Sequence, residues 1–140
     1  MGRLLAIDYG LKRVGLAVSD PLQIIATALE TVPAQNVFLF LREYCKKEEV
    51  EAFIVGKPLD LNLNTTDSTN AVLKFVDRLK KTFPNQPVHL HDERFTSKMA
   101  LDAMIRGGST KKDRRKKENI DKVSATIILQ SFMESQSFGR

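Results

Sequence analysis

Short hydrophobic runs separated by polar turns open this chain, and their lengths predict strands. Apolar strands are expected over residues 3–8 and 14–19, joined by a turn that contains Gly10. A third strand is expected around residues 26–32, where Pro33 closes it. Strands joined this tightly can pair as an antiparallel meander.

Beyond residue 35 the spacing of apolar residues changes, and helices are expected to alternate with strands. Apolar side chains recur every three or four residues after Asn36, over about 70–83 and over 120–132, which predicts three amphipathic helices. A compact apolar strand is expected at 52–55 and a fifth strand at 88–92.

This order of elements predicts a mixed α/β fold with a five-stranded sheet and helices packed on it. The first three strands can be antiparallel, whereas the later alternation of helix and strand requires parallel crossovers. A further helix is expected between Thr96 or Ser97, which can cap its start, and Gly107-Gly108, which can end it. No repeat, low-complexity tract or linker interrupts the chain, so residues 1–140 are expected to form a single domain.

Composition excludes several classes of protein. Hydrophobic residues make up 42% and charged residues 28% of the chain, as in ordinary soluble globular proteins. No apolar run approaches the roughly 18 residues that span a bilayer, and the N-terminus lacks the pattern of a secretory signal. One cysteine, Cys45, excludes an internal disulfide and a multi-cysteine zinc site, and we expect it in the core. A cytoplasmic protein with no membrane partner is therefore expected.

The net charge of +5 comes from one segment. Residues 106–122 contain eight basic and three acidic residues, so this segment carries +5 and the rest of the chain sums to zero. Such a segment favours a nucleic-acid partner, because each phosphate that a basic side chain neutralises releases counterions and so promotes binding. On charge alone, a solvated loop that keeps the protein soluble is an equal alternative. No aromatic residue lies between Lys111 and Lys117, so this run is expected to hold backbone phosphates without reading bases. Its candidate contacts are Arg114, Arg115, Lys116 and Lys117.

Acidic residues occur at three positions where burial would be costly. Asp8 ends the first apolar strand, Asp92-Glu93 end the fifth, and Asp121 lies in the first turn of the last helix. A carboxylate in such a place is unfavourable unless it is paired, hydrogen-bonded or bound to a metal. Each acid also has a simpler explanation. Asp8 can cap a turn, Asp92 or Glu93 can form a surface ion pair with Arg94, and Asp121 can interact favourably with the helix dipole.

Three carboxylates brought together repel one another unless cations intervene. Their oxygen atoms suit hard divalent ions, Mg²⁺ or Mn²⁺, and a pair of such ions is a standard arrangement for phosphodiester hydrolysis. Together with the basic segment that adjoins Asp121, this combination favours a nuclease. Arg13, Arg94 and Thr96 are candidates for phosphate contacts, with an exposed turn arginine and a helix cap as alternatives. His89 and His91 share one face of the fifth strand and are expected to be strand-face residues rather than ligands.

Four motifs, in order, resemble the YqgF (RuvX) family, bacterial relatives of the RuvC Holliday-junction resolvase. They are the run from Asp8 to Ala17 with Ser19-Asp20, the run Val55–Leu59, the run Asp92–Thr96, and Asp121 with Ala125, Ile128 and Leu129. The resemblance covers nearly the whole chain. The chain departs from the family pattern at three places. Lys57 replaces a residue that is usually apolar, and Ser124 replaces a usual alanine. The loop after Pro58 usually carries a Gly-Thr pair, and here Thr65-Thr66 is found nearby. No departure falls on an acidic motif position; the loop change falls in a region of expected substrate contacts.

The resemblance implies a ribonuclease-H-like fold and assigns Asp8, Glu93 and Asp121 as catalytic acids that bind the metal. It also implies maturation of the 5′ end of pre-16S ribosomal RNA, with Holliday-junction resolution as the older proposal for the family. Structured RNA is therefore favoured over branched DNA, and ribosomal precursor particles are candidate partners. Whether the chain is a monomer or a homodimer, and whether Asp92 is a further ligand, stays open.

Two other functions fit parts of the sequence. A non-catalytic ribosome-assembly or transcription factor would use the basic segment and leave the acids structural roles. A nucleotide-binding domain of the actin or sugar-kinase type also opens with Asp-x-Gly, but it needs two such domains and no phosphate-binding glycine motif is present. The enzyme is favoured, because three acids at these positions are hard to explain without a cation.

Overall fold

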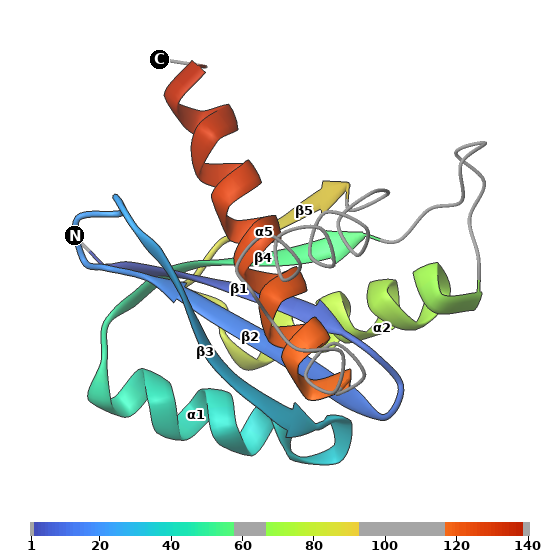
Figure 1. Cartoon of the computed structure of the whole chain (residues 1–140). Helices are drawn as coiled ribbons and strands as arrows, with labels where there is room; N and C mark the ends of the chain where they lie inside the picture. Colours follow the sequence, from blue (N-terminus) through green and yellow to red (C-terminus); the bar gives the residue numbers. More distant parts are fainter. Residues whose placement is uncertain (1, 58–66, 93–116, 139–140) are drawn as a thin grey trace.

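A five-stranded mixed sheet organises the described part of the chain. The structure, a computed structural model, describes residues 2–57, 67–92 and 117–138, with the backbone alone at 67–68, 92, 117–123 and 137–138. The strands are β1 (Arg3–Tyr9), β2 (Arg13–Ser19), β3 (Ala26–Pro33), β4 (Val50–Lys57) and β5 (Val88–Asp92). Their order in the sheet is β3-β2-β1-β4-β5 (Figure 1). The first three strands are antiparallel, and β4 and β5 extend the sheet in parallel with β1, as predicted.

Helices cover both faces of this sheet. On one face lie α1 (Val37–Lys47), which follows the 3₁₀ turn η1 (Ala34–Asn36), and α2 (Asp67–Thr82). The long helix α5 (Lys117–Phe138) crosses the other face, and its C-terminal turns extend beyond the sheet (Figure 1). No helix within the described ranges has both the length and the apolar character needed to cross a bilayer.

Two elements are longer than their apolar patterns predict. Strand β4 extends two residues beyond 52–55 at each end, and α5 begins three residues before residue 120 and ends six residues after Phe132. The residues after Phe132 carry no glycine or proline before Gly139, so nothing in the sequence interrupts the helix there. The helix predicted between residue 96 and Gly107 lies outside the described residues.

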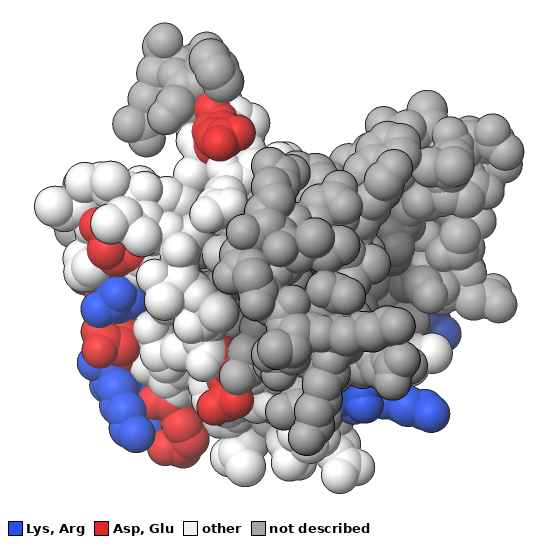
Figure 2. Space-filling view, in the orientation of Figure 1, with Lys and Arg blue, Asp and Glu red and all other residues white. Residues whose placement is uncertain are grey.

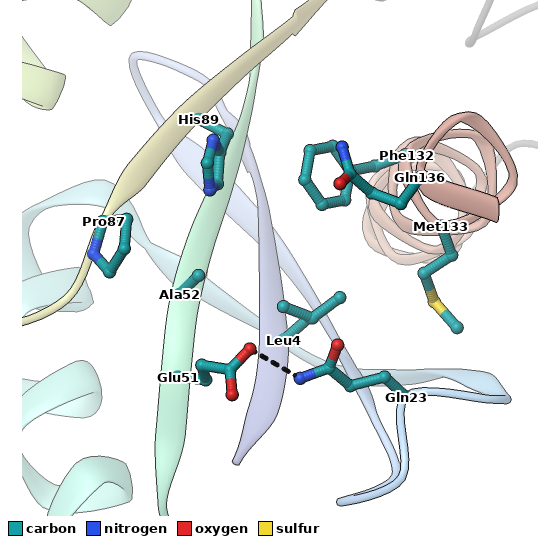
Figure 3. Close-up of a pocket in the computed structure, with 9 residues that line it drawn as sticks. All are labelled: Leu4, Gln23, Glu51, Ala52, Pro87, His89, Phe132, Met133 and Gln136. Carbon is teal, nitrogen blue, oxygen red and sulfur yellow. Dashed lines mark hydrogen bonds between the residues drawn. The ribbon is translucent and has the colours of Figure 1, made fainter. Parts of the chain in front are cut away.

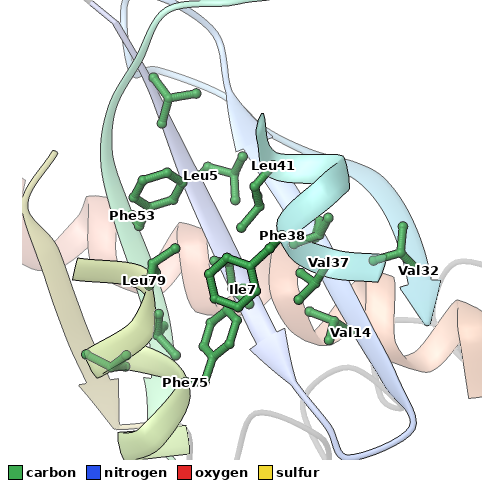
Figure 4. Packing of buried hydrophobic residues seen from close by; sticks show 14 of the residues in the cluster. Leu5, Ile7, Val14, Val32, Val37, Phe38, Leu41, Phe53, Phe75 and Leu79 are labelled. Atoms are coloured by element: carbon green, nitrogen blue, oxygen red, sulfur yellow. The ribbon is translucent and has the colours of Figure 1, made fainter. Parts of the chain in front are cut away.

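Side chains alternate between the two faces of the sheet along each strand, and this divides the core into two layers. On the α1–α2 face, Leu5 and Ile7 of β1 pack with the fully buried Phe53 of β4 and with side chains of both helices (Figure 4). On the α5 face, Leu4 and Ala6 pack under the helix together with other small and aliphatic residues. The buried residues of this second layer are Leu4, Ala6, Ala17, Ala52, Ile54, Ala125, Ile128, Leu129 and Phe132. The strand alanines leave room for α5 to lie close to the sheet.

Cys45 is only partly buried, so the expectation of a core position holds in part. It lies on α1 at the margin of the core layer and packs against it. Burial raises the pKa of the thiol, which therefore stays protonated at neutral pH and is a poor nucleophile.

A buried hydroxyl joins the start of β1 to the end of β2. Ser19 Oγ accepts a hydrogen bond from the Leu4 amide at 2.9 Å and donates to the Asp20 carbonyl at 2.9 Å. Replacing it in Ser19→Ala leaves a buried amide without this acceptor, so we expect unfolding free energy to fall by about 1–3 kcal/mol. Urea unfolding measures this loss. Ser135→Ala, at an exposed helical serine, is the control and is expected to change stability by no more than about 0.5 kcal/mol. Equal stability of the Ser19 variant and the wild type would contradict the assignment.

Candidate active site

Asp8 lies near the carboxyl end of β1, on the face of the sheet that α5 covers. Every second residue of a strand points to the same face, so Asp8 shares its face with Ala6 and Leu4. Both of these residues pack under α5. The Asp8 side chain is half-buried. Because β4 and β5 run parallel to β1, the carboxyl ends of all three strands meet at this edge, where α/β sheets commonly bind ligands.

Glycines flank Asp8 on both neighbouring strands. Gly15 of β2 is its direct partner in the antiparallel ladder. On β4, Val55 pairs with Ile7, so the next residue, Gly56, lies beside Asp8 on the same face. The two positions directly beside Asp8 on the neighbouring strands therefore carry no side chain beyond hydrogen, which leaves the surface of the sheet accessible there.

The sequence alone does not single out Gly15 and Gly56 as site residues. Each stands in an apolar strand, where a glycine weakens packing and often marks a close approach by a ligand or another backbone. That signal becomes informative only when the register places both glycines beside one acid.

Arg13 reaches the same face as Asp8. It precedes Gly15 by two residues on β2, so it lies diagonally across the ladder from Asp8, at about 7–8 Å between backbone positions. The side chain is half-buried. The structure thus brings the predicted phosphate contact close to the predicted catalytic acid.

The turn between these two residues depends on Gly10. A Cβ at this position would lie 2.6 Å from the Arg13 carbonyl oxygen, which is closer than side-chain carbons come to backbone oxygens. The close approach that requires glycine here is made by the turn itself. Gly10 therefore shapes the hairpin that presents Asp8 and Arg13.

The N-terminal half of α5 lies at the same end of the sheet as Asp8. Near the C-terminal end of the helix, Phe132 and Met133 border a cavity with Leu4, at the opposite end of β1. The helix therefore runs against the direction of β1, and its first turns approach the β1–β2 hairpin (Figure 1). The backbone of Asp121 lies one turn before Ala125, which is fully buried against the sheet.

Most of the other predicted site residues fall where the structure gives no side chain. Asp121 and Lys117 are described by their backbone positions in α5 alone. The predicted residues outside the described ranges are Glu93, Arg94, Thr96, Arg114, Arg115 and Lys116. Among the described side chains, no group of three histidine, cysteine or acidic residues forms a metal site. Of the three predicted metal ligands, Asp8 is thus the one whose side chain the structure describes.

The two histidines of β5 lie on one face of the strand, as predicted, and pack against α5. The rings of His89 and His91 lie 5.2 and 6.2 Å from the Phe132 ring, measured between centroids. His91 Nε2 also shares a hydrogen bond of 2.8 Å with Ser131 Oγ. These contacts fix α5 on the sheet and give both histidines a structural role.

A cavity of about 210 Å³ lies at the opposite edge of the sheet (Figure 3). Its walls include Leu4, Ala52 and Pro87, at or just before the beginnings of β1, β4 and β5, and a 2.8 Å hydrogen bond from Gln23 to Glu51 crosses its rim. This cavity is separated from Asp8 by the length of β1. It is therefore not part of the candidate active site.

Comparison with known proteins decides the family. A model of the RuvX family, described as Holliday junction resolvase, matches residues 2–135. The chain belongs to the RuvX family. A protein of Amoebophilus asiaticus named "Putative pre-16S rRNA nuclease" is 57% identical over 135 residues, which cover 96% of each chain. A protein of Phocaeicola vulgatus with the same name is 49% identical over 138 residues, 99% of each chain. The predicted family is thus confirmed.

Solved structures support the predicted fold of this RuvX member. Thermus thermophilus RuvC in complex with a Holliday junction substrate matches with a TM-score of 0.61 at 16% identity over 96% of both chains. A second structure of Thermus thermophilus RuvC matches with a TM-score of 0.56 at 17% identity over the same share of each chain. At this level of identity the likeness establishes the ribonuclease-H-like fold, and the expected strand directions agree with it.

Proposed function

We propose that this chain is a divalent-cation-dependent nuclease that cleaves structured RNA, and that its substrate is the 5′ region of pre-16S ribosomal RNA. The observation that carries the proposal is the position of Asp8, between two glycines at the carboxyl edge of the sheet and at the end where α5 begins. The names of the RuvX relatives support the choice of substrate. We further propose that residues 1–140 act as one domain in the cytoplasm.

The donor chemistry at Asp8 fits Mg²⁺ or Mn²⁺. A half-buried carboxylate flanked by Gly15 and Gly56 offers the oxygen ligand that these ions prefer. We assign Glu93 and Asp121 as the other two ligands, since α5 carries Asp121 toward the edge where Asp8 lies. When bound, such ions activate water and stabilise the leaving oxygen.

The remaining residues hold and orient the substrate. Arg13 lies on the same face as Asp8, where its guanidinium can bind phosphate oxygens next to the reacting one. We assign Arg94 and Thr96 to further phosphate contacts near Glu93. The basic run, with Arg114, Arg115, Lys116 and Lys117, binds more distant backbone phosphates and steers the substrate to the site.

Metal binding is expected to stabilise the folded chain. An ion that binds the native state alone raises the melting temperature, by about 5–10 °C at one hundred times its dissociation constant for a protein of this size. Differential scanning fluorimetry with increasing Mn²⁺ measures this shift, which we expect Asp8→Asn to reduce and Asp77→Asn, at an exposed residue of α2, to retain. A non-catalytic binder would show no Mn²⁺-dependent shift in any variant.

Cleavage of two labelled substrates side by side tests the proposed substrate. One is a precursor fragment that spans the 5′ end of 16S ribosomal RNA, and the other is a four-way DNA junction. We expect Mg²⁺- or Mn²⁺-dependent cleavage of the RNA alone. Cleavage of the junction alone would make the chain a resolvase, and tight binding of the RNA without cleavage would make it a binding factor.

A further inference from the structure

A groove on the other face of the sheet begins next to Asp8. It lies between α1, α2 and the β1–β2 turn and encloses about 610 Å³. Tyr9, the residue after Asp8, points to this face because neighbouring residues of a strand alternate. The groove and the candidate active site are therefore adjacent at the carboxyl end of β1, on opposite sides of the same strand.

Aromatic rings form the floor of the groove. The rings of Tyr9 and Phe75 stack with their centroids 4.5 Å apart, and Phe38 lies 5.3 Å from Phe75. The guanidinium of Arg78 lies over the Phe38 ring at 4.1 Å from its centroid. Phe38 and Phe75 are themselves buried against Arg78 and Tyr9, so the accessible surfaces of the floor are the half-buried Tyr9 ring and the exposed guanidinium of Arg78. An aromatic ring and a planar cation are both surfaces on which nucleic-acid bases stack.

The charge of the groove is positive. Lys74 and Arg78, one turn apart on α2, border it, and none of the described residues that line it is acidic. Two small areas of Lys and Arg side chains are visible at the lower right of Figure 2, in the region of the β1–β2 turn and α2 of Figure 1. At the rim, the side chain of Leu11 is 73% exposed, which provides an apolar contact beside the cations.

We propose that this groove binds an unpaired strand of the nucleic-acid substrate, which continues from the bond cleaved at Asp8. The inference rests on the proposed nuclease function and specifies its substrate as a duplex with a single-stranded extension. Cations that follow the backbone together with aromatic faces for the bases are the common features of single-strand binding sites. The volume is that of a small-ligand site, so it suits one or two nucleotides and is too small for a helical stem.

Two RNA probes and one lysine test this assignment. Lys74 is exposed, so Lys74→Ala removes a cation from the groove without disturbing the core. Lys80→Ala is the matched control, because Lys80 is an exposed residue of the same helix that does not border the groove. Both changes are made in the full chain carrying Asp8→Asn, and fluorescence anisotropy measures binding of a blunt RNA stem and of the same stem with a single-stranded extension.

We expect Lys74→Ala to weaken binding of the extended RNA by about 3- to 10-fold. It should also lower the slope of log affinity against log salt by about 0.7, the value for one phosphate on a single strand. Binding of the blunt stem and both affinities of the Lys80→Ala protein should stay at the level of the Asp8→Asn chain.

Equal losses for the two RNAs, or equal losses in the two lysine variants, would overturn the assignment. Analytical ultracentrifugation covers the other occupant. If Lys74→Ala converts a dimer into a monomer and leaves RNA binding unaltered, the groove binds a second copy of the chain. The outcome is independent of cleavage: selective loss of extended-RNA binding would uphold the groove even if the wild-type chain cut no RNA.

Discussion

Asp8→Asn is expected to lower the rate of metal-dependent RNA cleavage by at least about 100-fold. Loss of residues that merely support a metal ligand costs about 10- to 100-fold, so loss of a direct carboxylate ligand should cost more. Asparagine has nearly the shape of aspartate, and the glycines Gly15 and Gly56 beside it leave room for the exchange. The effect should therefore appear in the rate of cleavage while the fold is retained.

Single-turnover cleavage of the pre-16S fragment in Mg²⁺ measures this effect. Asp77→Asn removes the same charge from an exposed position on α2 and should leave the rate within about twofold of wild type. If Asp8→Asn cleaves at the rate of the Asp77 variant, Asp8 is not part of the catalytic site.

Phe53→Ala is expected to have the largest effect on stability, about 3–5 kcal/mol. The Phe53 side chain is fully buried on β4 between the sheet and α2, and its ring lies 5.2 Å from that of Phe83. Truncation leaves a cavity that the surrounding strands cannot fill, because β4 is hydrogen-bonded on both sides. Since small domains are stable by about 5–15 kcal/mol, this change removes a large part of the total.

Urea unfolding followed by circular dichroism measures the loss. Leu39→Ala is the matched control, because Leu39 is a large aliphatic residue of α1 that is 61% exposed and should cost no more than about 0.5 kcal/mol. A similar loss in both variants would mean that the core layer under α1 and α2 is not packed as described.

The sheet could be predicted from the sequence because each strand carries its own signal. Short apolar runs ended by Gly10 and Pro33 define the meander, and the helix-length gap between the first three strands and β4 requires a parallel crossover. The register of the strands could not be predicted in this way. It depends on which side chains interdigitate across the sheet, which is a property of the whole core.

The candidate site could be predicted only where a residue carries its own signal in the sequence. A charged residue at the end of an apolar strand marks Asp8 from sequence alone. The glycines beside it become meaningful only in the folded sheet, because Gly15 and Gly56 are separated from Asp8 by seven residues and by a whole crossover. The groove at Tyr9 escapes sequence analysis as well, since its aromatic residues come from three elements far apart along the chain.

The central claim is that the edge of the sheet at Asp8 holds the divalent ion. Amide NMR spectra of the ¹⁵N-labelled chain with substoichiometric Mn²⁺ test it most directly, because the paramagnetic ion broadens the resonances of nearby amides. We predict loss of the signals of Tyr9, Gly15 and Gly56, while those of Leu4 and Val50 at the other end of the sheet persist. Asp8→Asn should restore the lost signals. Broadening centred on Leu4 and Val50, or no selective broadening at all, would contradict the account.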